Sequence, residues 1–339
     1  MNSSKQKFYA TFTAALLMIF ITVSHGYAAS EGMSASSTSE QGKTKKKLVP
    51  QSFVDDFKDS LSSHSLSSDV PYFQKTSTSD MTYLSFMIRL NASELKKSER
   101  VIPYLIAELL TKGTKSYPRG KIENFLEKYS IRLSCSPSFM CGTTYSSVSC
   151  FLTVDNQYLQ EGLSVLASVI KEPSFDQADY QVAMKNARIS AKKTCLSDPD
   201  LIANNALNTI FYNHDHPWFT TDVHLLKSLD MTTLDKVKTT YQKIMNASRM
   251  MLSSISSVKP KVMVTKLNAS FAPLPRWFTK MTKIPKPTHS SRSFVVKFSD
   301  DAPGTSGDTV SMILKNLLPG IYDDKSVAFK LLHEILNQN

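Results

Sequence analysis

The run His214-Asp215-His216 places two imidazole groups around a carboxylate, a set of side chains that can bind a metal ion. A stable metal site needs three or four ligands that converge in space. The run supplies its ligands from one short segment, and nothing in the sequence points to a further partner. We therefore favour a structural or solvated turn over a metal site at this position.

Four cysteines, at 135, 141, 150 and 195, are the other candidates for chemistry. The first three lie on or beside adjacent predicted strands, so one disulfide among them and unpaired buried thiols both remain open. No histidine stands at a motif spacing that would activate a cysteine nucleophile. The connectivity does not follow from the spacing.

The run from Tyr104 to Thr114, YLIAELLTKGT, is an apolar helix pattern that ends in Gly113-Thr114. It resembles the active-site helix of the insulinase, pitrilysin and mitochondrial processing peptidase family, which reads His-x-x-Glu-His and then Gly-Thr. In that motif two histidines at i and i+4 hold zinc, and the glutamate takes a proton from the zinc-bound water. Alignment on Gly113-Thr114 places Tyr104 and Glu108 at the histidine positions and Ala107 at the glutamate position. The resemblance implies a helix that has lost the zinc ligands and the general base.

The family also takes a third zinc ligand, a glutamate, from a later helix. The matching helix here is 177–194, where Asp179 in the first turn is the sole carboxylate. Four basic residues follow it, and their charge would repel a dication: Lys185, Arg188, Lys192 and Lys193. We expect neither zinc nor any other cofactor.

The order of the predicted elements follows one module of the family between Val70 and Val258. We predict strands at 84–90, 131–135, 148–154 and 250–256, and helices at 100–110, 120–128, 177–194 and 234–245. The helix at 177–194 is one of two long helices expected between 154 and 216. His216-Pro217-Trp218 and Thr220-Thr221-Asp222 match a family turn that precedes a leucine-rich segment. The resemblance implies an α+β fold in which a mostly antiparallel sheet carries helices on one face, as in a processing-peptidase-like metallohydrolase module.

The N-terminus predicts export. Lys5 and Lys7 precede an apolar run of about sixteen residues, short of the roughly twenty that span a bilayer, and small residues follow near Ala28. We predict a signal peptide at 1–28, a disordered or weakly ordered lead-in at 29–69, the module at 70–258, a proline-rich linker at 259–293 and the truncated start of a second similar module at 294–339. Within the lead-in, 53–66 has the pattern of a short amphipathic helix. No later segment is apolar enough to cross a membrane.

These observations favour a non-proteolytic exported homologue of a zinc metallopeptidase, periplasmic or secreted, and not an enzyme. Its expected role is to bind an extended peptide or to act as a scaffold beside a zinc-bearing subunit or a second copy. One alternative is a truncated remnant without activity, and a less favoured one is a zinc endopeptidase with substitute ligands. The net charge of +11 is dispersed and suits acidic peptides or anionic envelope surfaces, while no nucleic-acid-binding signature is present.

The signal-peptide prediction is tested by expressing the full chain in a host with a secretory pathway. We expect export and cleavage near Ala28, because Lys5, Lys7 and the short apolar run have the pattern that signal peptidase acts on. N-terminal sequencing of the exported protein checks this. An intact Met1 in the membrane fraction would show that the segment is an anchor instead.

Overall fold

The computed structural model describes residues 61–90, 94–137, 147–197, 212, 216, 219 and 222–277, and for 192–197 and 222–224 it describes the backbone alone. The chain divides into two compact units, and every described residue lies in the unit Val49–Ile313. The predicted signal peptide at 1–28 and the predicted second module at 294–339 lie outside the described residues.

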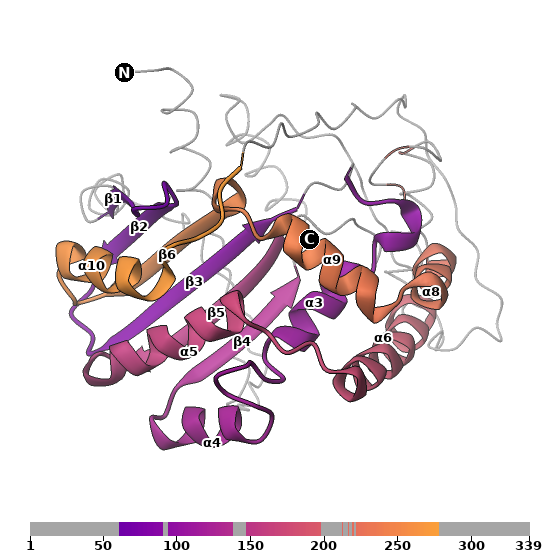
Figure 1. Ribbon diagram of the computed structural model, residues 1–339, viewed down its shortest axis with the longest axis horizontal. Helices are drawn as coiled ribbons and strands as arrows, with labels where there is room; N and C mark the ends of the chain where they lie inside the picture. The colour runs from indigo at the N-terminus through magenta and orange to yellow at the C-terminus, as the bar shows by residue number, and fades with distance from the viewer. Residues whose placement is uncertain are drawn as a thin grey trace, which may run out of the picture. The chain divides into compact units, whose positions relative to one another are not determined.

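Six strands form one sheet in the order β1-β2-β6-β3-β5-β4 (Figure 1). The pair β2 and β6 is parallel, and the other neighbouring pairs are antiparallel. The strands are β1 Leu61–Ser65, β2 Pro71–Thr76, β3 Met81–Arg89, β4 Arg132–Pro137, β5 Ser147–Asp155 and β6 Met250–Ser256. The predicted strand at 250–256 therefore matches β6 residue for residue.

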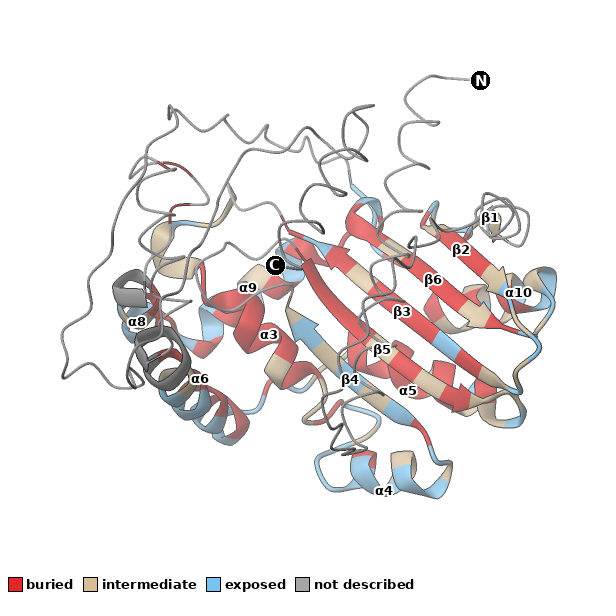
Figure 2. Cartoon of the chain, turned by 180° about the vertical axis from the view of Figure 1, so that it is seen from behind, coloured by how far each residue is buried: buried red, intermediate tan, exposed pale blue. Residues whose placement is uncertain are grey.

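Helices α5 and α10 lie on one face of the sheet (Figure 1), and the view from behind presents the other face (Figure 2). This arrangement confirms the predicted α+β fold with a mostly antiparallel sheet. The helices are α3 Ile102–Leu110, α4 Lys121–Lys128, α5 Leu159–Lys171, α6 Gln177–Ser197, α8 Asp222–Met231, α9 Leu234–Ile244 and α10 Pro260–Phe271. Single turns of 3-10 helix stand at η2 Lys97–Glu99, η3 Asn156–Tyr158 and η4 Ala247–Arg249.

The core lies between the sheet and these helices. The apolar side chains of the central strands are buried at alternate positions, as expected when one face of a sheet carries the core: Leu84, Phe86 and Ile88 in β3, and Val148, Cys150, Leu152 and Val154 in β5. Ser85, Ser147 and Ser149 beside them are buried as well. Helix α5 comes close to β5 at Gly162, where a Cβ atom would stand 3.1 Å from a methyl carbon of Val154. A larger residue at 162 would require Val154 or the helix to shift by a few tenths of an ångström.

Helix α10 corrects the predicted boundary at Val258. The prolines of 259–293 predicted a linker, but Pro260 begins a helix, a position where proline is tolerated because its N–H would have no partner in the helix. The helix buries Met263, Leu267 and Phe271, and the Phe271 ring stacks on Phe86 of β3 with 5.1 Å between centroids. The module thus continues to at least 277, and the remainder of the predicted linker lies outside the described residues.

Strand β1 corrects the helix predicted at 53–66 over its described part. Residues 61–65 read LSSHS and pair antiparallel with β2, from Leu61 opposite Lys75 to Ser65 opposite Pro71. Serine and histidine are weak helix formers, and pairing with β2 supplies the backbone partners that a helix would otherwise provide. The lead-in therefore gives way to the sheet at Leu61, earlier than the predicted start at Val70.

A disulfide joins Cys135 of β4 to Cys150 of β5. The two residues are direct cross-strand partners, with their Cα atoms 4.0 Å apart. This is one of the pairings that the sequence left open. Cys141 and the side chain of Cys195 lie outside the described residues.

None of the described helices combines the length and the apolar character that a membrane span requires. Helix α10 offers a direct test of how much the corrected boundary matters.

Phe271→Ala should lower the free energy of unfolding by about 3–5 kcal/mol, because a fully buried aromatic side chain is removed from its contact with Phe86. Val262→Ala on the same helix is the matched control. Val262 is 45% exposed, so its loss should change stability by less than about 0.5 kcal/mol. Urea denaturation measures both, and equal effects would show that α10 does not belong to the cooperative unit.

Candidate functional site

Helix α3 carries the residues that the sequence placed at the former zinc site. It packs against β4 and β5 on the sheet and against α6 and α9. Pro103 in its first turn fits the chain without cost, since N–H groups there have no partner within the helix. Every residue of the helix is buried except Glu108. A helix packed in this way leaves only a small part of its surface available for binding or catalysis.

Tyr104 is 9% exposed, Ala107 is 1% exposed and Glu108 is half-buried. Burial, and then the negative charge of nearby Glu108, raise the pKa of Tyr104 to about 12. At neutral pH Tyr104 is therefore a neutral phenol, which is a poor ligand for zinc. Ala107 carries no group that could accept a proton. The three positions lie together on the helix as predicted, but they supply one carboxylate and no imidazole.

Helix α6, where the sequence places the third ligand position, turns an apolar face inward. Its buried residues recur at helical spacing: Tyr180, Ala183, Met184, Ala187 and Ala191. Asp179 is buried as well and forms an ion pair with Arg119, with 2.8 Å between the Nη1 and Oδ1 atoms. The carboxylate that could have replaced the family glutamate is thus already neutralised by a guanidinium.

The basic residues of α6 lie away from its buried face where their side chains are described. Lys185 is exposed, and Arg188 pairs with Asp230 of α8 at 2.6 Å. The side chains of Lys192 and Lys193 are outside the described residues. The inward face of α6 therefore presents methyl, thioether and phenol groups to α3.

The residues at this site do not fit the zinc ion that the family motif implies. Two of the three α3 positions are a buried phenol and a methyl group, and Asp179 is held by Arg119. Among the described residues, no three histidine, cysteine, aspartate or glutamate side chains cluster as a metal site would require.

Gly113 and Thr114 close the helix with a turn that only glycine can make. The φ angle of Gly113 is +151°, and a Cβ atom there would stand 2.9 Å from the backbone nitrogen of Arg119. The Ser174 N–H donates to the Gly113 carbonyl at 3.0 Å. Thr114 is buried, its Oγ1 accepts from the Tyr117 N–H at 2.8 Å, and it lies 2.6 Å from the Ser168 hydroxyl. The role of the Gly-Thr motif in this chain is structural.

Of the run His214-Asp215-His216, only His216 lies among the described residues. It is 4% exposed and stacks on Tyr212 with 4.6 Å between centroids. Its carbonyl accepts from the Phe219 N–H at 2.9 Å and from the Arg100 guanidinium at 3.4 Å. Burial lowers the pKa of Arg100. This setting agrees with the turn that the sequence favours.

Sequence reasoning missed a pocket of about 580 Å³ between the end of α5, helix α9 and residues 273–277. Its lining residues come from four separate parts of the chain, so no motif spacing indicates them. Pro273 and Pro275 fall within the stretch that the sequence predicts as a linker. Lys115 directly follows the Gly113-Thr114 motif. It is the one residue of the lining that lies beside a motif recognisable in the sequence.

The fold is that of a peptidase-like α+β module. Residues 98–217 match the model of the family described as Insulinase (Peptidase family M16), which confirms the family resemblance predicted from the sequence. No curated protein sequence shows significant similarity to the chain.

Solved structures share the fold at low identity. A protease from Helicobacter pylori matches with 13% identity and a TM-score of 0.55, over 67% of this chain and 53% of the protease chain. A peptidase M16 inactive domain from Pseudomonas fluorescens matches with 17% identity and a TM-score of 0.58, over 67% and 54% of the two chains. The periplasmic protease PqqL from Escherichia coli matches with 12% identity and a TM-score of 0.56, over 68% and 26%. The chain thus spans about half or less of the length of these proteins.

The zinc site is tested on the purified full chain. We expect no stoichiometric zinc after dialysis and no hydrolysis of an unfolded peptide, because Tyr104, Ala107 and Glu108 give one carboxylate in place of two imidazoles and a base. Metal analysis and a peptide-cleavage assay check this. The expectation fails if one zinc per chain is retained by the native chain and is lost in Glu108→Ala.

Proposed function

We propose that this protein is a non-proteolytic partner of a zinc-bearing peptidase chain, or of a second copy of itself, and that it holds peptides without cutting them. The observation that carries the proposal is helix α3, whose buried face offers Tyr104 and Ala107 where the family motif has a ligand and a base. The likeness to an inactive domain from Pseudomonas fluorescens supports the fold of such a partner. Loss of a general base alone lowers a rate by orders of magnitude.

The proposed location is outside the cytoplasm, in the periplasm or the medium. The basic residues Lys5 and Lys7 and the apolar run behind them support export. The disulfide between Cys135 and Cys150 also supports this location, because disulfides persist in oxidising compartments. PqqL, one of the proteins with this fold, is periplasmic.

Strand β4 is the proposed site for an extended peptide. It ends the sheet, so among the described strands β5 is its one neighbour. The Cα atoms of Cys135 and Cys150 are 4.0 Å apart, closer to the roughly 4.5 Å of a non-hydrogen-bonded pair than to the roughly 5.5 Å of a hydrogen-bonded one. In that register Leu133 and Cys135 direct their N–H and C=O groups away from β5. A peptide can add there as a further strand.

Two features suit β4 to this role. The disulfide fixes the strand to β5 at its middle, which keeps the open edge from fraying. Pro137 ends the row of donors, because proline has no N–H to offer at the next outward position. The register of an added peptide is therefore limited to the stretch around Leu133 and Cys135.

Amide hydrogen exchange followed by NMR tests the β4 edge within one strand. In the free protein the Leu133 and Cys135 amides should exchange at least about tenfold faster than those of Ser134 and Ser136, which in the register inferred above donate to β5. A neutral, N-acetylated octapeptide of alternating threonine and valine should slow exchange at 133 and 135. Exchange at 134 and 136 should stay as it was, so these two amides are the internal control.

Protection of all four amides to the same extent would indicate general stabilisation and would contradict an added strand. No change at 133 and 135 at millimolar peptide would also contradict it. The partner role is tested separately by co-purification of the tagged full chain with a zinc-bearing peptidase chain from the same source, and by its oligomeric state in solution.

A further inference from the structure

The pocket beside the Gly113-Thr114 turn lies on other elements than β4. Its volume of about 580 Å³ falls within the roughly 300–1,000 Å³ of ligand-binding pockets. The floor is apolar, because Phe175, Tyr241 and Met245 are all buried and line it. The Phe175 and Tyr241 rings meet edge to face with 5.1 Å between centroids. An apolar side chain of a ligand would find aromatic surface here.

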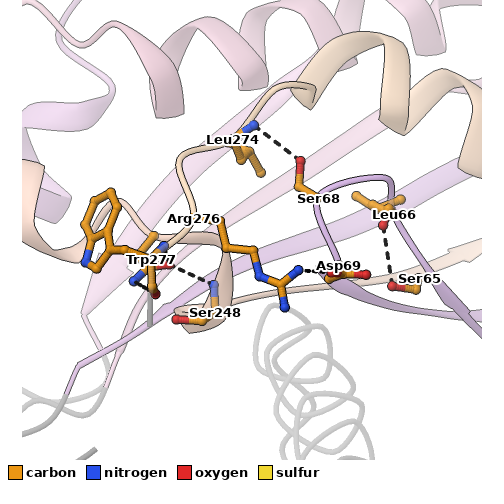
Figure 3. Close-up of polar contacts among 9 residues, drawn as sticks. Ser65, Leu66, Ser68, Asp69, Ser248, Leu274, Arg276 and Trp277 are labelled. Carbon is orange, nitrogen blue, oxygen red and sulfur yellow. Dashed lines mark hydrogen bonds and ion pairs between the residues drawn. The ribbon is translucent and has the colours of Figure 1, made fainter. Parts of the chain in front are cut away.

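The segment 273–277 forms one wall of the pocket and is held in place by contacts with other parts of the chain (Figure 3). The Leu274 N–H donates to the Ser68 hydroxyl at 3.3 Å, and Arg276 forms an ion pair with Asp69. The Asn246 side chain accepts from the Trp277 N–H at 3.4 Å and donates to its carbonyl at 2.9 Å.

These bonds to Trp277 use its backbone, so its side chain is left for other contacts. Figure 3 shows the indole extending away from the residues that anchor the segment. The indole is 43% exposed and lines the pocket together with Pro273 and Pro275. A large, exposed aromatic ring beside prolines is a surface on which peptides pack well.

The backbone conformation of Phe175 is a second observation that favours a functional role for the pocket. Its φ angle is +44°, in the left-handed region that a bulky side chain rarely adopts. Such backbone strain costs on the order of 1–3 kcal/mol and is concentrated at functional sites. Here it holds the ring of Phe175 in the floor, against Tyr241.

The charges around the pocket are mostly positive. Lys115, Lys171 and Lys238 line it from the motif turn, the end of α5 and α9, and none of them forms an ion pair within 4.0 Å with a described carboxylate. The one acid of the lining is Glu172. Its Oε1 accepts from Ser116 and from Ser168, and these bonds, the Ser116 bond first, lower its pKa. With Glu172 ionised, the pocket keeps an excess of positive charge.

We propose that this pocket binds an acidic peptide segment in which an aromatic or aliphatic side chain stands beside aspartate or glutamate. The apolar side chain packs on Phe175 and Trp277, and the carboxylates pair with Lys115, Lys171 and Lys238. The proposal rests on the proposed function, because it takes the ligand to be a peptide. It adds the chemical class of that peptide and a binding position distinct from the β4 edge.

Fluorescence anisotropy with the full chain tests the pocket. The probe is a fluorescein-labelled peptide Ala-Glu-Phe-Glu-Ala, and its comparison is Ala-Gln-Phe-Gln-Ala. Lys171→Glu/Lys238→Glu should weaken binding of the acidic probe by at least about tenfold, because two charge-assisted contacts become repulsive. Lys243→Glu paired with Lys185→Glu makes the same change of charge at exposed residues outside the lining and should leave the affinity within about twofold.

A second readout does not depend on charge variants. Trp277 is one of two tryptophans in the chain, so Trp218→Phe makes it the sole one. Its emission should shift when the acidic peptide binds, and the glutamine peptide should produce no shift at the same concentration. Trp277→Ala should weaken binding while leaving the backbone bonds to Asn246 in place.

Equal losses in the pocket pair and the control pair would overturn the proposal, since they would show attraction to net charge alone. Equal affinity for the glutamine and glutamate peptides, or no binding of either, would overturn it as well. If the neutral octapeptide still protects the Leu133 and Cys135 amides in those cases, the peptide-holding function stands and only the acidic pocket is lost.

Discussion

The packing of helix α3 against the sheet and against helices α6 and α9 is the interaction on which the rest of the described structure depends. The helix lies between the sheet and two other helices, and its residues Ile102, Leu105, Ile106 and Leu110 are shielded from water. Each such side chain contributes roughly 1.5–3 kcal/mol when it leaves water. The same packing decides what the helix can do, because a charged base or an ionised ligand at position 107 would stand in this apolar layer without a partner. The burial that stabilises α3 is therefore the same property that limits which groups it can carry at position 107.

The turn after α3 connects that layer with the new pocket. Gly113 lets the chain pass close to Arg119, and Thr114 ties the turn to Ser168 near the end of α5. Lys115 follows at once and reaches the pocket lining, where its backbone N–H also donates to the Glu172 carbonyl at 3.1 Å. The Gly113-Thr114 turn therefore places Lys115 in the lining of the pocket.

Elements with a strong apolar period were predictable from the sequence, and elements held by distant contacts were not. Strand β6 and helix α3 are apolar runs with clear ends, so their bounds matched or came within two residues. The prolines around helix α10 favour a linker in the sequence, whereas in the fold 260–271 is helical and stacks its Phe271 ring on Phe86 of β3. Strand β1 was missed because its serine-rich sequence gains a strand only by pairing with β2.

The same distinction holds for the candidate site, between residues identified by a local motif and contacts that depend on the tertiary fold. The identities of Tyr104, Ala107 and Glu108 at the motif positions follow from the local sequence. The pairing of Asp179 with Arg119, and the meeting of Lys115, Lys171, Lys238 and Trp277 around one cavity, depend on the tertiary fold. These residues come from four separate segments, so their spacing in the sequence does not indicate that they lie together.

The strand order also dictates when this sheet can form. Strands β2 and β3 are joined by only four residues, 77–80, yet they do not pair with each other, because β6 lies between them. The gap stays open until residues 250–256 have been synthesised and inserted, parallel to one neighbour and antiparallel to the other. Pairing across such a sequence separation is slow to form. A nascent chain that has not reached residue 250 therefore cannot complete this sheet, so its core closes late in synthesis.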